Sequence, residues 1–186
     1  MKRQMPFRII IMLATVALLL VLSGCGAKTV SQGSNTSQEP APVQEPEPAK
    51  PEVIKEKINV YFAADDDLTA LKEQQVEIQY ETNDQKFDAA FKALQQDGAN
   101  GEMSLWKKVE LLHTKLASGA LTIDVHLPDE ARFGAPGEEL AMQSIQKTMF
   151  QFDDVSSLDI LVDGEQVDSL MGHDSLDHPI VKPTTK

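Results

Sequence analysis

The stretch that decides the fold is VELLHTKLASGALTIDVHL, residues 109–127. In its second half apolar and polar residues alternate, and the apolar side chains are expected to face the same side: Leu121, Ile123, Val125 and Leu127. An Ala-Ser-Gly-Ala turn at 117–120 joins the two halves. The pattern therefore predicts a β-hairpin with one face in a hydrophobic core.

Further strands and helices are expected on both sides of this hairpin. Alternation and helical spacing predict strands at 57–62, 75–80, 158–162 and 166–170, and helices from 83 or 84 to 98 and from 138 to about 152. Each helix carries one apolar stripe: Phe87, Ala90, Phe91 and Leu94 on the first, and Leu140, Ile145, Met149 and Phe152 on the second. This order predicts an α+β two-layer sandwich, a mixed or antiparallel sheet with two helices on one face, over residues 53–186.

The N-terminus has the three parts of an export signal. Positive charges precede an apolar run at 9–22, and small residues follow it. A helix of that length spans about 21 Å, which is short of the roughly 30 Å hydrocarbon core of a bilayer. A retained transmembrane span is therefore the weaker interpretation.

The only cysteine of the chain, Cys25, stands directly after this signal. Leu22, Ser23, Gly24 and Cys25 together resemble the lipobox of bacterial lipoproteins. The resemblance implies that residues 1–24 are a lipoprotein signal peptide and that a diacylglyceryl group on the Cys25 thiol anchors the chain to the extracytoplasmic face of the membrane. A buried small side chain or a reactive thiol are the other roles open to a free cysteine.

Residues 25–52 are expected to form a disordered linker. They are rich in Pro, Ser and Glu and have almost no large apolar side chains. In a polyproline II conformation such a stretch holds a domain up to roughly 80 Å from the bilayer. A recognition site for proline-binding modules is the alternative.

The charge balance excludes several partners. The formal charge is −12, and loss of residues 1–24 would remove three basic residues and leave −15. Such a chain repels phosphate backbones and anionic headgroups, so no nucleic acid partner is expected. With a single cysteine the chain has neither an internal disulfide nor a thiolate metal set.

Taken in order, the motifs from about residue 55 to 183 resemble the GerMN domain of sporulation and spore-germination proteins. The matching stretches are INVYFAADDDL at 58–68, FKAL at 91–94, LTIDVHL at 121–127, Thr148 and Phe152 ahead of LDILVDGE at 158–165, and GHDSLDHPIVKP at 172–183. The chain departs from the family pattern at Asp97-Gly98-Ala99, where members commonly have Gly-Pro, and shows no second copy of the domain.

The resemblance implies a non-catalytic interaction and assembly domain, similar to ring-building domains, on a lipoprotein that acts in sporulation or germination. Its partners would be other envelope or sporulation proteins, of unknown identity, with no cofactor and no small-molecule substrate. The alternative is an envelope enzyme, or a metal- or ligand-binding lipoprotein that acts at the cell wall.

A search for chemistry supports the non-catalytic interpretation. No catalytic triad or nucleophile elbow is evident. If Leu112 opposes Val125 on the inner face of the hairpin, His113 lies beside Asp124 on the outer face, with His126 two residues away. This group could hold zinc, but solvated polar residues on an exposed face are the simpler interpretation.

Two other features allow more than one interpretation. The acidic run at 65–67 lacks the spacing of an EF-hand loop, so a charged connection after a strand explains it better than calcium. Trp106 lies among Met103, Leu105 and two lysines between a helix and the hairpin. It suits an interface anchor, or else it fills the open end of the core.

Overall fold

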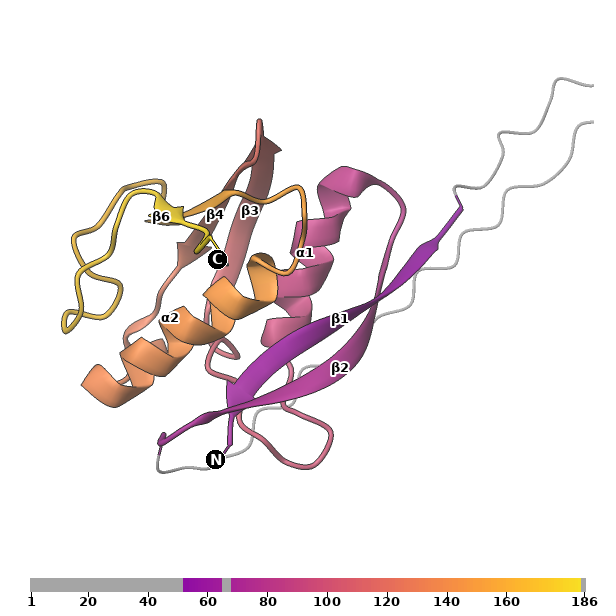
Figure 1. The fold of residues 1–186 in the computed structure, drawn as a ribbon. Coiled ribbons are helices and arrows are strands. Elements are labelled where there is room, and N and C mark those ends of the chain that lie inside the picture. Colours follow the sequence, from indigo (N-terminus) through magenta and orange to yellow (C-terminus); the bar gives the residue numbers. More distant parts are fainter. Residues whose placement is uncertain (1–51, 65–67, 185–186) are drawn as a thin grey trace, which may run out of the picture. The chain divides into compact units, whose positions relative to one another are not determined.

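The strands of the domain divide between two sheets. The computed structural model describes residues 52–64 and 68–184. The elements in chain order are β1 (Ile54–Ala63), β2 (Leu71–Tyr80), α1 (Asn83–Leu94), β3 (Glu110–Ala117), β4 (Ala120–His126), η1 (Asp129–Ala131), α2 (Ala135–Met149), β5 (Ser157–Val162) and β6 (Ile180–Val181). β1 and β2 form one sheet, with an isolated bridge from Ala63 to Met103, whereas the other described strands form a sheet in the order β3-β4-β5-β6 (Figure 1). The α+β class is confirmed, but the described strands make two sheets instead of one.

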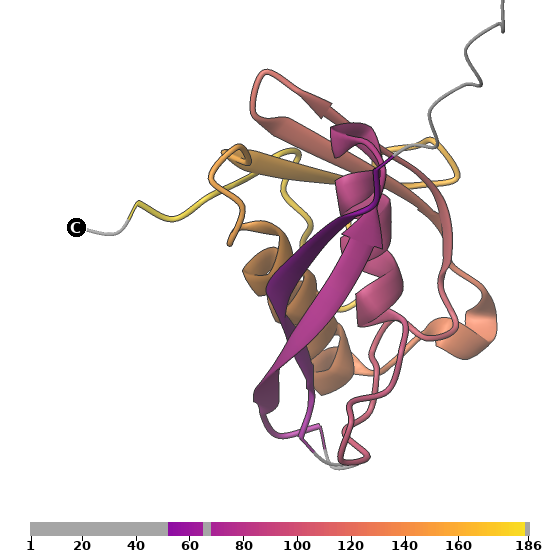
Figure 2. The same ribbon diagram turned by 90° about the vertical axis from the view of Figure 1, so that its right-hand side faces the viewer.

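The four-stranded sheet is mixed. β3 and β4 form the predicted antiparallel hairpin, β4 and β5 are parallel, and β5 and β6 are antiparallel. Parallel neighbours need a crossover connection, and α2 lies within the segment that makes it. Both helices lie on the same side of this sheet (Figure 2). The inward side chains of β4 and the residue directly after it are buried as predicted: Leu121, Ile123, Val125 and Leu127.

The two-stranded sheet covers the helices. β1 and β2 pair over ten residues, from Ile54 opposite Tyr80 to Ala63 opposite Leu71. β1 packs against α2 and β2 against α1, and α1 also contacts β3. Alternation predicted too short a strand for β2, because its first half contains the polar segment 72–75. Backbone pairing with β1, and not an apolar face, holds this segment in the sheet.

The helices bury the stripes that the sequence predicts. Phe87 and Phe152 pack edge to face with ring centroids 5.3 Å apart, and Phe91 packs on the Trp106 ring at 5.5 Å. α2 begins at Ala135, three residues before the predicted start, because Gly134 is its N-cap and Pro136 lies in its first turn.

The turn of the β3–β4 hairpin uses two residues with positive φ. Ser118 has a φ of 52° and Gly119 a φ of 85°, which matches the twist of a two-residue hairpin loop. The Gly119 carbonyl accepts hydrogen bonds from the backbone N–H groups of Ser156 and Ser157. A Cβ atom at Gly119 would lie 2.6 Å from Ser156 Oγ, so the close approach of these two segments also requires glycine.

Two strand predictions are wrong. The register of the hairpin shifts between Leu111 and His113, so Leu111, and not Leu112, lies opposite Val125. Leu112 is 44% exposed as a result. Residues 166–170 form no strand; after a single bridge between Val162 and Glu165, the chain makes a long loop and returns to β5 only at β6.

Candidate functional site

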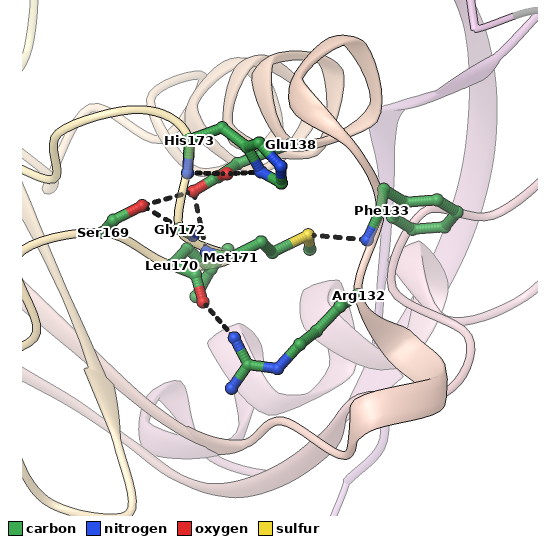
Figure 3. Close-up of polar contacts among 8 residues, drawn as sticks. All are labelled: Arg132, Phe133, Glu138, Ser169, Leu170, Met171, Gly172 and His173. Carbon is green, nitrogen blue, oxygen red and sulfur yellow. Dashed lines mark hydrogen bonds and ion pairs between the residues drawn. The ribbon is translucent and has the colours of Figure 1, made fainter.

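The strongest polar cluster of the described residues centres on Glu138, in the first turn of α2. Its side chain is fully buried. Oε1 accepts hydrogen bonds from the Met171 backbone N–H (2.7 Å) and the Ser169 hydroxyl (2.9 Å). Oε2 accepts one from the His173 backbone N–H and lies 2.9 Å from His173 Nδ1. Figure 3 shows that the carboxylate reaches directly into the loop after β5.

Two further contacts fasten the same loop. The Phe133 backbone N–H donates to Met171 Sδ at 3.2 Å, and Arg132 Nη1 donates to the Leu170 carbonyl at 3.4 Å (Figure 3). We call the contacts of Glu138, Phe133 and Arg132 with the loop at 169–173 the Glu138 clamp. It holds a segment without regular secondary structure against the start of α2.

The Glu138 clamp requires a charged carboxylate. Burial on its own would raise the pKa of Glu138, but the hydrogen bonds from Met171, Ser169 and His173 outweigh this effect and lower the pKa to about 2. A carboxylate that stays ionised and has every oxygen engaged cannot act as a general acid near neutral pH. The cluster is therefore suited to holding structure, not to proton transfer.

Two other buried carboxylates also fasten turns. Glu102 accepts hydrogen bonds from Lys72, Gln74 and the backbone N–H of Asn100, and the Lys72 hydrogen bond is the largest of the effects that bring its pKa to about 2. Asp124 Oδ1 accepts a hydrogen bond from the Gly164 backbone N–H at 2.9 Å. Asp124 is buried because the turn after β5 covers it, whereas alternation alone placed it on a solvated face.

The predicted histidine group does not converge on one point. His113 lies beside Asp124 as expected, with Nδ1 3.6 Å from Oδ2. His126 instead pairs with Asp163, at 2.8 Å. In the described part of the chain no three His, Cys, Asp or Glu side chains are placed to hold a metal ion.

Trp106 belongs to the core. Its side chain is fully buried, and Nε1 donates to Ser144 Oγ (3.0 Å) and the Ala141 carbonyl (3.2 Å). The interpretation as an interface anchor is therefore wrong, because the indole offers no surface to a partner. The alternative, that Trp106 fills the core, fits the structure. The two lysines that follow it are exposed: Lys107 pairs with Asp97, and Lys108 donates to the Glu130 carbonyl.

Other predictions fall on parts of the chain that the structure does not describe. The lipobox residues Leu22, Ser23 and Gly24, the lipid acceptor Cys25 and the acidic run at 65–67 lie outside the described residues. Within 52–64 and 68–184, no helix combines the length and the apolar character needed to cross a membrane.

The most distinctive surface lies along one side of α2. We call it the α2 outer face, and it consists of Glu139, Met142, Gln143, Gln146, Lys147 and Phe150. One groove of about 520 Å³ lies at its C-terminal half, with Tyr61 and Lys182 on the opposite wall. A second groove of about 250 Å³ lies at its N-terminal half, against the loop that carries Asp174 and Asp177.

A further groove of about 360 Å³, next to Trp106, contains one ion pair. Its wall carries Asp97 and Lys107, which form an ion pair, and Lys108, whose ammonium donates to the Glu130 carbonyl. By contrast, neither Glu139 nor Lys147 on the α2 outer face forms an ion pair with another described residue.

The sequence analysis predicted neither the Glu138 clamp nor the α2 outer face, and the reason is the same for both. Acids are favoured at a helix N-terminus by the helix dipole, so the pair Glu138 and Glu139 at the start of α2 gives no sign by itself that one of them is buried. Adjacent residues on a helix point about 100° apart, so one of the pair had to face inward. The apolar positions Leu140 and Ala141 beside them were the available signal.

Comparison with known proteins places the domain. The family model Germane, described as sporulation and spore germination, matches residues 59–168. Among curated proteins no relative matches the chain. Solved structures are similar as well, among them the following three. A possible lipoprotein of Clostridium perfringens is 26% identical over 69% of this chain and 88% of that one, with a TM-score of 0.48.

The other two are from the sporulation protein GerM of Bacillus subtilis. Its tandem GerMN domains are 19% identical, over 69% of this chain and 45% of that one, with a TM-score of 0.47. Its first GerMN domain is 15% identical, over 68% of this chain and 97% of that one, with a TM-score of 0.52, and so shares the fold. Because the family model covers more than half of the sequence, this chain belongs to the Germane family of sporulation and spore germination.

Proposed function

We propose that the chain is a lipid-anchored lipoprotein on the extracytoplasmic face of the membrane, whose GerMN domain docks to other proteins during sporulation or germination and catalyses no reaction. The observation that carries the docking role is the use of the buried carboxylates. Glu138, Glu102 and Asp124 all bind backbone or side-chain donors of neighbouring loops. Such groups make a rigid scaffold, whereas catalysis needs groups free to meet a substrate.

The family match supports the proposed process. Residues 59–168 match a family described by sporulation and spore germination. Deletion of the gene is expected to leave vegetative growth unchanged and to lower the yield of heat-resistant spores or the rate of germination. Equal spore counts and equal germination kinetics in the deletion strain would contradict the proposal.

The anchor is proposed from the lipobox alone. Replacement of Cys25 with Ala should abolish incorporation of labelled palmitate and release the chain from the membrane fraction, because the thiol is the acyl acceptor. Thr29→Ala, which leaves the lipobox intact, is the matched control and should label normally. Labelling that persists in the Cys25 variant would exclude the lipoprotein interpretation.

The absence of catalysis is tested separately. The purified chain should release no soluble fragments from cell-wall material. Fragment release by the wild-type chain that is lost in His113→Ala, a variant of an exposed residue, would favour the envelope enzyme over the docking protein.

A further inference from the structure

The α2 outer face differs from an ordinary solvated helix face. Solvent-facing helix positions usually carry charges of both signs, interspersed. Here the centre is formed by Met142, Gln143, Gln146 and Phe150, all half-buried. Of the six residues of this face, only Glu139 and Lys147 are charged, and both are exposed. An uncharged centre with Met and an aromatic residue, bordered by charges, is the composition typical of protein interfaces.

The charges at the two ends have opposite signs. The groove at the N-terminal half has three acidic residues in its wall, Glu139, Asp174 and Asp177, and no basic one. The groove at the C-terminal half has Lys147 and Lys182 and no acidic one. The two grooves share Gln143 and Gln146, so they form one continuous surface with a negative end and a positive end.

These charges have no partners of opposite sign within the described residues. Lys147 stands over the Tyr61 ring, 5.5 Å from its centroid, and Lys182 donates to the Phe152 carbonyl. Glu139 accepts a hydrogen bond only from Gln143. No basic side chain of the described chain pairs with Asp174 or Asp177. Charge that is left unpaired beside an uncharged centre favours a complementary partner.

A second copy of this chain supplies that complement. In a two-fold symmetric contact, each residue at one end meets its counterpart from the other end of the partner. Gln143 lies midway between Glu139 and Lys147 in the sequence. With the axis near Gln143, two antiparallel α2 helices would place Glu139 of each copy against Lys147 of the other. The acidic loop at 174–177 would then face Lys182.

We propose that the α2 outer face binds the same face of a second copy, antiparallel and around a two-fold axis near Gln143. The side-chain amide of Gln146 has no hydrogen bond within the described chain and can pair across this contact. This inference goes beyond the docking role proposed above, because it names one partner. Crosslinking tests it, whereas spore formation tests the proposed function.

The test uses the full chain in intact cells. Gln143→Cys places a thiol beside its own symmetry mate, so a short bis-maleimide should yield a covalent dimer. Lys115→Cys, on the exposed edge strand β3, is the control for random encounter. The wild-type chain, whose only cysteine is the proposed lipid acceptor Cys25, gives the background. The dimer yield of Gln143→Cys should exceed both by about tenfold.

A charge swap separates a second copy from any other partner. Lys147→Glu, added to Gln143→Cys, should lower the dimer yield to the control level, because like charges then face each other at both ends. Glu139→Lys added to that variant should restore the yield, since both copies carry the complementary change. Lys115→Glu should have no effect.

Three results would overturn the proposal. They are a yield for Gln143→Cys equal to that of Lys115→Cys, a yield that Lys147→Glu leaves unchanged, and a charge swap that fails to restore the dimer. The last would point to a different protein on this face, because only a self-complementary surface is rescued by exchanging its own charges.

Discussion

His173 contacts the Glu138 carboxylate at two points: its backbone N–H donates to Oε2 at 2.9 Å, and its Nδ1 lies 2.9 Å from the same oxygen. The two residues are 35 positions apart, so this contact joins the start of α2 to the loop after β5. The loop has little secondary structure of its own, and we therefore expect its order to depend on Glu138.

Glu138→Gln should destabilise the domain. The amide keeps one acceptor oxygen but turns an NH₂ group toward backbone donors, which leaves buried groups unpaired. A loss of roughly 2–4 kcal/mol in the free energy of unfolding is expected. Urea unfolding followed by fluorescence measures it, since Trp106 is the only tryptophan and is buried. The exposed neighbour gives the control: Glu139→Gln should change stability by less than about 0.5 kcal/mol.

Acid should weaken the domain through the same residue. The pKa of Glu138 is lowered from 4.5 to about 2 in the folded state. Because the pKa of Glu138 in the folded state lies below that in the unfolded state, the stabilisation is complete above pH 4.5 and is lost as the pH falls toward 2. It amounts to about 3 kcal/mol. Urea unfolding over this pH range should show the loss in the wild-type chain and a smaller loss in Glu138→Gln. Parallel curves for the two chains would contradict the assignment.

His178 should act in the opposite direction. Its Nδ1 lies 2.6 Å from Asp159 Oδ1 and its Nε2 2.8 Å from the Val167 carbonyl oxygen, so both nitrogens face acceptors. The hydrogen bond with Asp159 is the main cause that raises the pKa of His178 above 6.5. The stabilisation of the fold by the charged His178 ring is present below pH 6.5 and is lost as the pH rises through the raised pKa.

An NMR titration of the His178 ring checks this prediction. Asp159→Asn should return the pKa of His178 toward 6.5, because the amide no longer carries the negative charge that favours the imidazolium. An unchanged titration in that variant would show that Asp159 is not the cause.

Thr148→Val should stabilise the domain. Thr148 is fully buried, and its hydroxyl has no hydrogen-bond partner among the described residues. Valine has nearly the same shape and carries no unpaired polar group, so a gain of about 1 kcal/mol is expected. Thr114→Val is the matched control, because the Thr114 hydroxyl donates to Asp88 at 2.7 Å. That variant should lose stability, and equal changes in the two variants would refute the reasoning.

Local patterns predicted much of the fold and little of the polar architecture. The stripes on α1 and α2 and the buried face of β4 follow from spacing, because backbone geometry decides which residues share a face. The bulge that exposes Leu112 does not alter composition or alternation, so no local signal marked it. For Trp106 the sequence left two interpretations open, an interface anchor or a residue that fills the core, and only the packing of the fold shows that it is buried.

The amino-acid sequence by itself determined the element types, the β3–β4 hairpin with its Ser118-Gly119 turn, and the membership in a sporulation family that residues 59–168 confirm. Tertiary structure decided that β1 and β2 form a separate sheet, that β6 pairs with β5, and that Glu138 is buried while Glu139 is exposed. The physical reason is the distance along the sequence over which each feature is determined. Faces and turns depend on neighbours a few residues away, whereas sheet partners and buried charges depend on segments brought together only by the completed core.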